Sequence, residues 1–299
     1  MGLYLRPGRL DEALAALAER ADGPDGRKWT VLAGATDVYP TRIGRPIDDD
    51  VLDISAIDGL RAIRRDGPDI RIPAGATWTD LLRTDLPGSF EGLKTAARAV
   101  GGVQIQNRGT LCGNVCNASP AADGVPNLLA LDARVELSSM AGTREIPVGA
   151  FVTGNRRTLR RVDELVTALL VPVPAAGARS VFFKLGARAY LVISMAMVAV
   201  VVEPGRDGRV ATARIAVGAC SEVAVRLPAA EARLHGARPG AVMTAVPTVS
   251  AVTAADIAGS ITADDLAPLR PIDDVRASAA YRRAAALVLV RRAVTEVLA

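Results

Sequence analysis

A short proline-containing segment, residues 172–177, divides the chain into two parts that differ in their pattern of apolar residues. Its sequence, PVPAAG, combines prolines and a glycine with small side chains, which is typical of a linker between domains. Neither part shows the regular alternation of strand and helix that a doubly wound sheet requires. The sequence therefore predicts an α+β protein with two domains, at 1–174 and 178–299.

The spacing of apolar residues predicts the elements of each part. In the first part we expect helices over 10–20, from Asp80 and over 91–103, strands over 30–33, 51–54, 69–73, 133–138 and 165–171, a loop over 104–127 and a helix over 128–131. Thr79 is expected to cap the helix that begins at Asp80. In the second part we expect strands over 180–185, 191–202 and 210–217, then helices over 228–235, 247–258 and 275–298. Asp273 and Asp274 suit the positive end of the last helix.

Composition excludes several classes of function. The chain has 3 Cys and 1 His, too few for a disulfide-stapled scaffold, for an iron–sulfur cluster built by this chain alone or for a multi-histidine metal site. Aromatic residues make up only 3%, and the net charge of +4 is spread along the chain, so nucleic-acid binding is not expected. The densest basic cluster is Arg156, Arg157, Arg160 and Arg161, which favours a solvated helix face or a partner interface, with a phosphate-binding patch as the alternative.

The sequence also bears on location. The N-terminus lacks a basic start followed by a long apolar run, so we expect no signal peptide. The longest apolar stretch, residues 190–202, is too short for a membrane span and is rich in β-branched residues, which predicts a buried strand. We therefore expect a cytoplasmic protein with reduced cysteines and no membrane span.

Two segments have the composition of ligand-binding loops. The first, Val31 to Val38, is an apolar strand that enters a turn of small residues, where consecutive backbone N–H groups can hold a phosphate oxygen. An ordinary β-turn is the alternative.

The second segment, Asn107 to Asn114, brings together small residues, a hydroxyl and an amide, and Asp123 follows as an acceptor for a ribose hydroxyl. A surface loop rich in turn formers is the alternative there. The chain contains neither a GxGxxG following a strand nor a P-loop.

Four segments together resemble one known family. They are AGATD at 33–37, IRIPAGATWTDLL at 70–82, IQNRGTLCGNVCNASPAAD at 105–123 and FFKLGARAYLVISMAMVAV at 182–200. Their order and spacing are similar to those of the FAD-binding medium subunit of the xanthine dehydrogenase and carbon monoxide dehydrogenase family, the molybdenum hydroxylases. The resemblance implies a two-lobed FAD-binding domain of the vanillyl-alcohol-oxidase (PCMH) type, with lobes at about 1–55 and 56–174. A C-terminal domain of a three-stranded sheet plus helices follows.

The resemblance also implies a set of FAD-binding positions. They are Val31, Leu32, Ala33, Gly34, Ala35, Thr36, Asp37, Val38, Val100, Thr110, Leu111, Cys112, Gly113, Asn114, Asp123, Val166 and Lys184. Val100 falls near the isoalloxazine, and a cation at Lys184 would stabilise the anionic reduced flavin. A surface lysine at a strand end is the alternative for Lys184. No residue of this chain is expected to be catalytic or to bind a metal.

Three positions depart from the family pattern. Ala35 replaces the second glycine of the first loop, which is tolerable where its φ is negative. Cys112 replaces a glycine of the second loop and places a Cβ where the backbone approaches the pyrophosphate. Val192 replaces an aspartate, so we assign it no role. His235 is interpreted as a helix-end residue.

The function that the resemblance implies is electron transfer. In the family, substrate is hydroxylated at a molybdenum cofactor on a large subunit, and electrons pass through [2Fe–2S] clusters on a small subunit to FAD. They leave to NAD⁺, oxygen or a quinone, and the assembly is a dimer of heterotrimers. Two alternatives remain: a stand-alone FAD-dependent oxidoreductase of the same fold, such as the reductase that makes muramic acid precursors, and a degenerate non-enzymatic scaffold subunit, suggested by Cys112.

Overall fold

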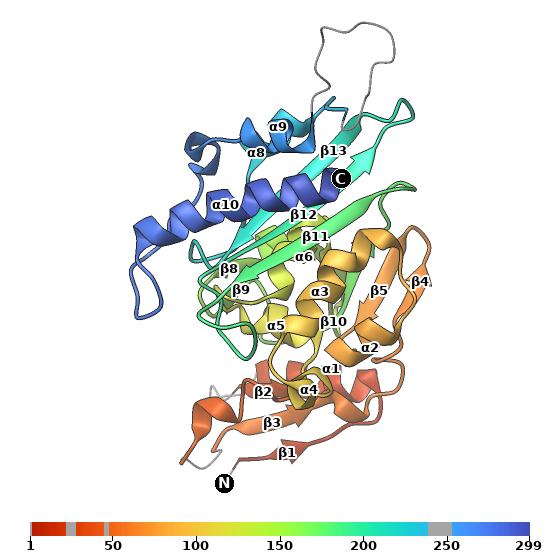
Figure 1. Cartoon of the computed structure of the whole chain (residues 1–299). Coiled ribbons are helices and arrows are strands. Elements are labelled where there is room, and N and C mark those ends of the chain that lie inside the picture. Colours follow the sequence, from red (N-terminus) through yellow and green to blue (C-terminus); the bar gives the residue numbers. More distant parts are fainter. Residues whose placement is uncertain (1, 22–27, 45–47, 239–252) are drawn as a thin grey trace, which may run out of the picture. The chain divides into compact units, whose positions relative to one another are not determined.

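The computed structural model describes residues 2–21, 28–44, 48–238 and 253–299, and the chain forms two compact units (Figure 1). Unit 1 comprises Met1–Thr84, Val100–Ser119 and Asp132–Pro172, and unit 2 comprises Asp85–Ala99, Pro120–Leu131 and Val173–Ala299. The units interleave along the sequence, since two short segments from the first half belong to unit 2. The division into domains at 1–174 and 178–299 stays a prediction.

Unit 1 begins with a small parallel sheet and a helix. The sheet has the order β1 (Tyr4–Leu5), β3 (Asp50–Asp53), β2 (Trp29–Leu32). The helix α1 (Leu10–Ala21) buries Ala13, Leu14 and Leu17, and it has acidic residues in its first turn and Arg20 in its last. The 3₁₀ turns η1 (Pro40–Arg42) and η2 (Ile54–Ala56) follow β2 and β3.

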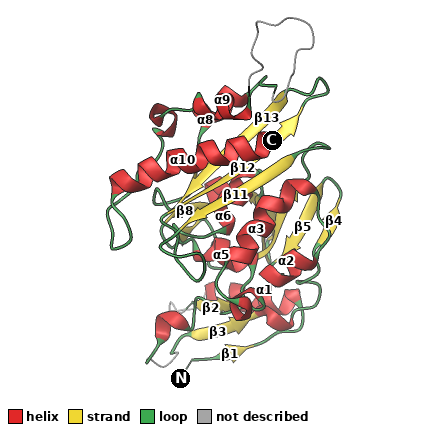
Figure 2. Cartoon of the chain, in the orientation of Figure 1, coloured by secondary structure: helices red, strands yellow, loops and turns green. Residues whose placement is uncertain are grey.

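A larger antiparallel sheet completes unit 1 (Figure 2). Its order is β4 (Arg64–Asp66), β5 (Asp69–Pro73), β10 (Leu165–Pro172), β6 (Arg134–Ser139), β7 (Gly142–Pro147). The central strand β10 is buried from Leu165 to Val171, which means that both faces of the sheet are covered at this strand. The short helices of this unit are α2 (Trp78–Arg83), α4 (Val103–Gln106), α5 (Leu111–Asn117) and α7 (Val148–Phe151), and a ribbon joins β8 (Val152–Gly154) to β9 (Arg157–Thr158).

Unit 2 is built on a second antiparallel sheet, with the order β11 (Arg179–Leu185), β12 (Ala196–Pro204), β13 (Val210–Gly218), β14 (Val225–Arg226). On one face, Val198 and Val200 of β12 share an apolar core with Val290 and Val294 of α10 (Ala279–Leu298). The helices α3 (Glu91–Ala99) and α6 (Gly124–Ala130) also pack on this sheet, α3 against β11 and α6 against β12 and β13. The remaining elements are η3 (Gly88–Phe90), α8 (Pro228–Leu234), α9 (Ala254–Gly259) and η4 (Ala263–Leu266).

The α+β class and the three long strands of the second part are confirmed, and the structure adds the short strand β14. Several boundaries were wrong. The segment 104–127, predicted as a loop, contains α5 and the start of α6, because Thr110 caps α5 and the apolar side chains of Leu111 and Val115 are fully buried. The helix predicted over 91–103 ends at Ala99, since Gly101 has a φ of +50°.

Other differences concern the ends of elements. The cap of α2 is Thr77, not Thr79, and β12 begins at Ala196, not Leu191. The long helix α10 begins after Ser278, so that Asp273 and Asp274 precede it. Of the helix predicted over 247–258, residues 247–252 lie outside the described residues.

The arginine cluster at 156–161 lies on β9 and its flanking loops and not on a helix. In the described ranges, no helix is long and apolar enough to cross a membrane.

Candidate functional site

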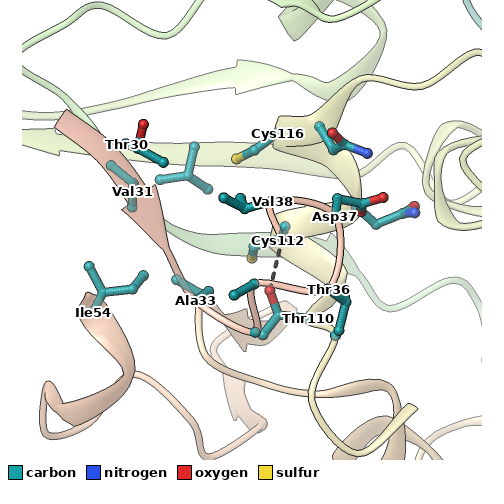
Figure 3. A pocket seen from close by; sticks show the side chains of 18 of the residues that line it. Thr30, Val31, Ala33, Thr36, Asp37, Val38, Ile54, Thr110, Cys112 and Cys116 are labelled. Atoms are coloured by element: carbon teal, nitrogen blue, oxygen red, sulfur yellow. Dashed lines mark hydrogen bonds between the residues drawn. The ribbon is translucent and has the colours of Figure 1, made fainter. Parts of the chain in front are cut away.

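Unit 1 contains a cavity of about 450 Å³ whose wall comes from segments far apart in the sequence (Figure 3). It is lined by Trp29, Thr30, Val31, Ala33, Gly34, Ala35, Thr36, Asp37, Val38, Ile54, Ala74, Trp78, Val100, Ile105, Gly109, Thr110, Cys112, Gly113, Asn114, Cys116, Asn117, Arg160, Leu165 and Val166. These residues belong mainly to β2 and the turn after it, to α5 and the residues before it, and to the start of β10.

The turn after β2 presents consecutive backbone donors. It is closed by the N–H groups of Val38 and Tyr39, which donate to the carbonyl oxygen of Ala35 at 3.2 and 3.3 Å. In the part of the chain that the structure describes, the N–H groups of Gly34, Ala35, Thr36 and Asp37 have no hydrogen-bond acceptor. All four residues line the cavity. Consecutive unpaired N–H groups of this kind form a concave anion-binding surface.

Gly34 allows the two sequence-predicted loops to touch. A Cβ at Gly34 would lie 1.8 Å from the carbonyl oxygen of Arg108 and 3.0 Å from the Cα of Gly109. The facing segment is itself held in place, because Trp78 N–H donates to Gly109 O at 3.1 Å and Gly109 N–H donates to Ile105 O at 2.7 Å. Only a residue without a side chain permits this backbone contact.

Ala35 corrects one expectation. Its φ is +58°, in the left-handed region, and not negative as the tolerance of a methyl group requires. The left-handed conformation costs a residue with a Cβ about 1–2 kcal/mol. The turn therefore requires the conformation that glycine adopts most easily, but in this chain an alanine occupies the position and is strained.

The second predicted loop is the first turn of α5. The hydroxyl of Thr110 accepts a hydrogen bond from Gly113 N–H at 3.0 Å, and Asn114 N–H donates to Thr110 O at 3.0 Å. The thiol of Cys112 lies 3.6 Å from the carbonyl oxygen of Ile72 on β5, and burial raises its pKa well above the usual range. Helical spacing brings Cys116, one turn after Cys112, to the same cavity.

Asp123 and Lys184 form a buried ion pair in unit 2. Lys184 Nζ lies 2.9 Å from Asp123 Oδ2, and the Ser194 hydroxyl donates to Asp123 Oδ1 at 3.3 Å. Lys184 Nζ also donates to the carbonyl oxygen of Ala99 at 3.3 Å. The Lys184 side chain is only 10% exposed, which rules out a surface lysine. Burial raises the pKa of Asp123, and the charge of Lys184 opposes this rise.

Comparison with known proteins identifies the family. Residues 1–174 match the FAD binding domain in molybdopterin dehydrogenase, and residues 181–297 match the CO dehydrogenase flavoprotein C-terminal domain. The chain belongs to the FAD-binding medium subunits of the molybdenum hydroxylase family. It is a flavoprotein subunit of a xanthine dehydrogenase-like or carbon monoxide dehydrogenase-like oxidoreductase.

Comparison with individual proteins supports the same family assignment. The chain is 35% identical to the nicotinate dehydrogenase FAD-subunit of Eubacterium barkeri over 64% of this chain and 65% of that subunit. It is 27% identical to the carbon monoxide dehydrogenase medium chain of Hydrogenophaga pseudoflava over 97% of this chain and 94% of that one. The solved structure of carbon monoxide dehydrogenase from the same organism, in a form that lacks the Mo-pyranopterin moiety, superposes with a TM-score of 0.83 at 28% identity and covers 100% of this chain and 98% of the matched chain.

The lining of the cavity has the chemistry that FAD requires. The unpaired N–H groups after β2 suit a pyrophosphate, and the apolar side chains of Val31, Ile54 and Trp78 suit flat ring systems. A Cβ at Gly113 would lie only 2.8 Å from the hydroxyl oxygen of Thr110. The residues that line the cavity therefore fit the chemical groups of FAD.

The structure brings most of the predicted positions to the cavity. Leu32 and Leu111 do not line it, because their side chains are buried in the core. Asp123 and Lys184 meet each other in unit 2. The cavity is also lined by residues outside the predicted FAD-binding positions: Trp29, Thr30, Ile54, Ala74, Trp78, Ile105, Gly109, Cys116, Asn117, Arg160 and Leu165. Helical periodicity from Cys112 would have indicated Cys116, whereas Arg160 was predicted only as a member of a basic cluster and was not connected with the FAD site.

Proposed function

We propose that this chain holds FAD in the cavity of unit 1 and relays electrons from [2Fe–2S] clusters of a partner subunit to an external acceptor. The observation that carries the proposal is the row of unpaired N–H groups from Gly34 to Asp37, which lines an otherwise mostly neutral cavity. When bound, FAD supplies the electron-accepting and electron-releasing chemistry. The chain supplies the binding surface and the electrostatic environment.

The residues of the cavity have separate tasks in this proposal. The N–H groups of Gly34 to Asp37 donate to the pyrophosphate, and the glycine at 34 keeps the turn in contact with the segment before α5. Val100 and Val166 contribute apolar surface for the flavin ring system. The resemblance further implies that Asp123 holds the FAD and that the cation of Lys184 stabilises its anionic reduced form.

The proposal extends to an assembly. A large subunit with a molybdenum cofactor and a small subunit with [2Fe–2S] clusters are the proposed partners, in a dimer of heterotrimers, and NAD⁺, oxygen or a quinone is the proposed acceptor. Support comes from relatives named as a medium chain, a medium subunit or an FAD-subunit of a dehydrogenase or hydroxylase. The cysteine count of 3 also requires that the clusters be ligated elsewhere. The cytoplasmic location stays a prediction.

Fluorescence titration tests the FAD site directly. The chain has 2 tryptophans, and both Trp29 and Trp78 line the cavity, so FAD binding should quench the intrinsic emission. Gly34→Ala inserts a methyl group against the carbonyl oxygen of Arg108 and separates the two segments. We expect the affinity for FAD to fall at least about tenfold, which corresponds to about 1.4 kcal/mol.

A matched substitution separates this effect from a general one. Gly8→Ala places its Cβ where no heavy atom lies within 4 Å, so this variant should bind FAD like the wild type. Circular dichroism of each variant checks that the fold is retained. Unquenched tryptophan emission of the wild type at saturating FAD, or equal affinity in Gly34→Ala and wild type, would contradict the proposed site.

A further inference from the structure

Arg160 is the one positively charged residue in the described lining of the cavity, and Asp37 is the one negatively charged residue. Arg160 lies in the loop between β9 and β10 and is half-buried. Cys116, Leu165 and Val166 line the same cavity. A mostly neutral wall therefore contains a single guanidinium, at a position outside the predicted FAD-binding positions.

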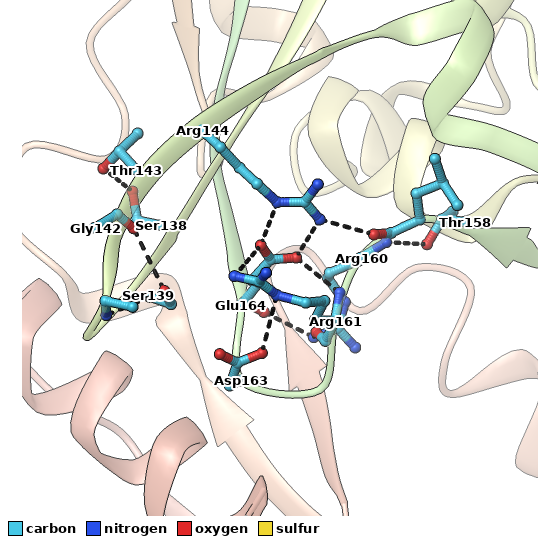
Figure 4. Close-up of polar contacts among 12 residues, drawn as sticks. Ser138, Ser139, Gly142, Thr143, Arg144, Thr158, Arg160, Arg161, Asp163 and Glu164 are labelled. Carbon is cyan, nitrogen blue, oxygen red and sulfur yellow. Dashed lines mark hydrogen bonds and ion pairs between the residues drawn. The ribbon is translucent and has the colours of Figure 1, made fainter.

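The position of this guanidinium is maintained by backbone carbonyl groups (Figure 4). Arg160 Nη1 donates to Glu164 O at 2.8 Å and to Arg161 O at 3.3 Å. Glu164 directly precedes Leu165 and Val166, so these bonds keep the cation beside a segment of the cavity wall. The fork of the guanidinium can make such bonds and still present its other N–H groups.

The charge of Arg160 is not neutralised by a carboxylate in the described ranges of the chain. The neighbouring Glu164 carboxylate binds other arginines: Arg144 Nε at 2.5 Å and Arg161 Nη2 at 3.1 Å. In unit 2, by contrast, the Lys184 ammonium is already paired with Asp123. Arg160 thus presents at the cavity a positive charge that no carboxylate of the described residues pairs with.

The field of this charge reaches the cavity wall. The Cys116 thiol is accessible, but desolvation by the surrounding protein raises its pKa to about 11, and the positive charge of Arg160 acts against that rise. A group that is close enough to stabilise a thiolate at Cys116 is also close enough to act on a ligand that fills the cavity.

We propose that Arg160 raises the reduction potential of the flavin bound in this cavity, as a cation that stabilises the negative charge gained on reduction. The inference rests on the proposed function, because it requires FAD in the cavity. Its physical basis is the interaction of a fixed positive charge with the negative charge that develops on the flavin. Val166, which the family resemblance gives as an FAD-binding position, is close in sequence to Arg160 and lines the same cavity.

Substitution of Arg160 in the full chain reconstituted with FAD tests the proposal. In Arg160→Gln, the ratio of reduced to oxidised FAD at a fixed ambient potential should fall about tenfold, which for a two-electron couple corresponds to about 30 mV. Arg160→Lys keeps the charge and should restore most of the ratio. Arg157→Gln is the matched control, because Arg157 is exposed on β9 and does not line the cavity. The potential is measured by equilibration with a redox dye.

Alkylation of the FAD-free chain provides a second measurement that does not depend on flavin. Iodoacetamide should modify Cys116 more slowly in Arg160→Gln than in wild type and Arg157→Gln, because the thiolate fraction falls; peptide mass spectrometry separates Cys116 from the buried Cys112 and Cys220. An unchanged potential in FAD-loaded Arg160→Gln, or an unchanged alkylation rate, overturns the role of Arg160. A wild-type chain that takes up no FAD overturns the proposed function, whatever the alkylation rates are.

Discussion

At the scale of single residues, Gly34 and Ala35 are neighbours in the same turn but are constrained for different reasons. Gly34 is restricted by space, because the carbonyl oxygen of Arg108 occupies the place of a Cβ. Ala35 is restricted by conformation, because its φ of +58° is unfavourable for any residue with a Cβ. The turn at the cavity therefore depends on Gly34, which has no side chain to clash, and on Ala35, whose backbone is strained.

Relief of that strain is the first prediction. Ala35→Gly should raise the free energy of unfolding by about 0.5–1 kcal/mol, since the strain removed exceeds the added entropy of the unfolded chain. Ala15→Gly, on the exposed side of α1, is the matched control and should lower it by about 1 kcal/mol. Urea denaturation followed by tryptophan fluorescence measures both. A loss of stability in Ala35→Gly would show that the turn is not strained.

At the scale of elements, the caps of α2 and α5 hold the two segments that line the cavity. Thr77 and Thr110 are each the N-cap of a short helix, and they pair with each other in an isolated β-bridge. Thr77 accepts from Asp80 N–H through its hydroxyl, while the Asp80 carboxylate accepts from Thr77 N–H at 2.9 Å. This reciprocal capping box fixes where α2 begins.

The cap of α2 gives the second prediction. Thr77→Ala should lower the free energy of unfolding by about 1 kcal/mol, because it removes the cap and half of the capping box. Thr79→Ala should change it by less than about 0.5 kcal/mol, since the Thr79 hydroxyl bonds to the Asn107 side chain in an exposed position. The pair is compared by urea denaturation under one set of conditions. Equal losses in the two variants would contradict the assignment of Thr77 as the cap.

At the scale of the whole molecule, the chain holds an FAD site but has too few ligands for the other centres of its family. Its 3 cysteines and 1 histidine cannot ligate two [2Fe–2S] clusters, each of which takes four ligands. The flavin is therefore expected to depend on partner subunits for electrons from an organic substrate.

This dependence gives the third prediction. The isolated chain loaded with FAD should be reduced by dithionite but not by purines, aldehydes or N-heterocycles. The flavin absorbance is followed under anaerobic conditions, with dithionite added last as the positive control. Bleaching by any of these substrates without added subunits would favour the stand-alone oxidoreductase and count against the electron relay.

The sequence by itself determined the features that depend on residues close together in the chain. The small residues from Gly34 to Asp37 indicated a tight turn, and the β-branched runs indicated β12 and β13. The spaced pattern from Asn107 to Asp123 indicated the family, which the domain matches then showed. Such signals survive in a single sequence because propensity and motif spacing are local.

Only the tertiary structure decided what surrounds these features. Arg160 and Trp29 line one cavity although they are far apart in the chain, and no local pattern contains that information. The residues from Leu111 to Asn117 looked like a loop because of their glycine and asparagines, yet the burial of Leu111 and Val115 makes them a helix. The left-handed conformation of Ala35 likewise follows from the turn that must place its N–H at the cavity. Contacts between distant segments outweigh local propensity at each of these positions, and those contacts exist only in the folded chain.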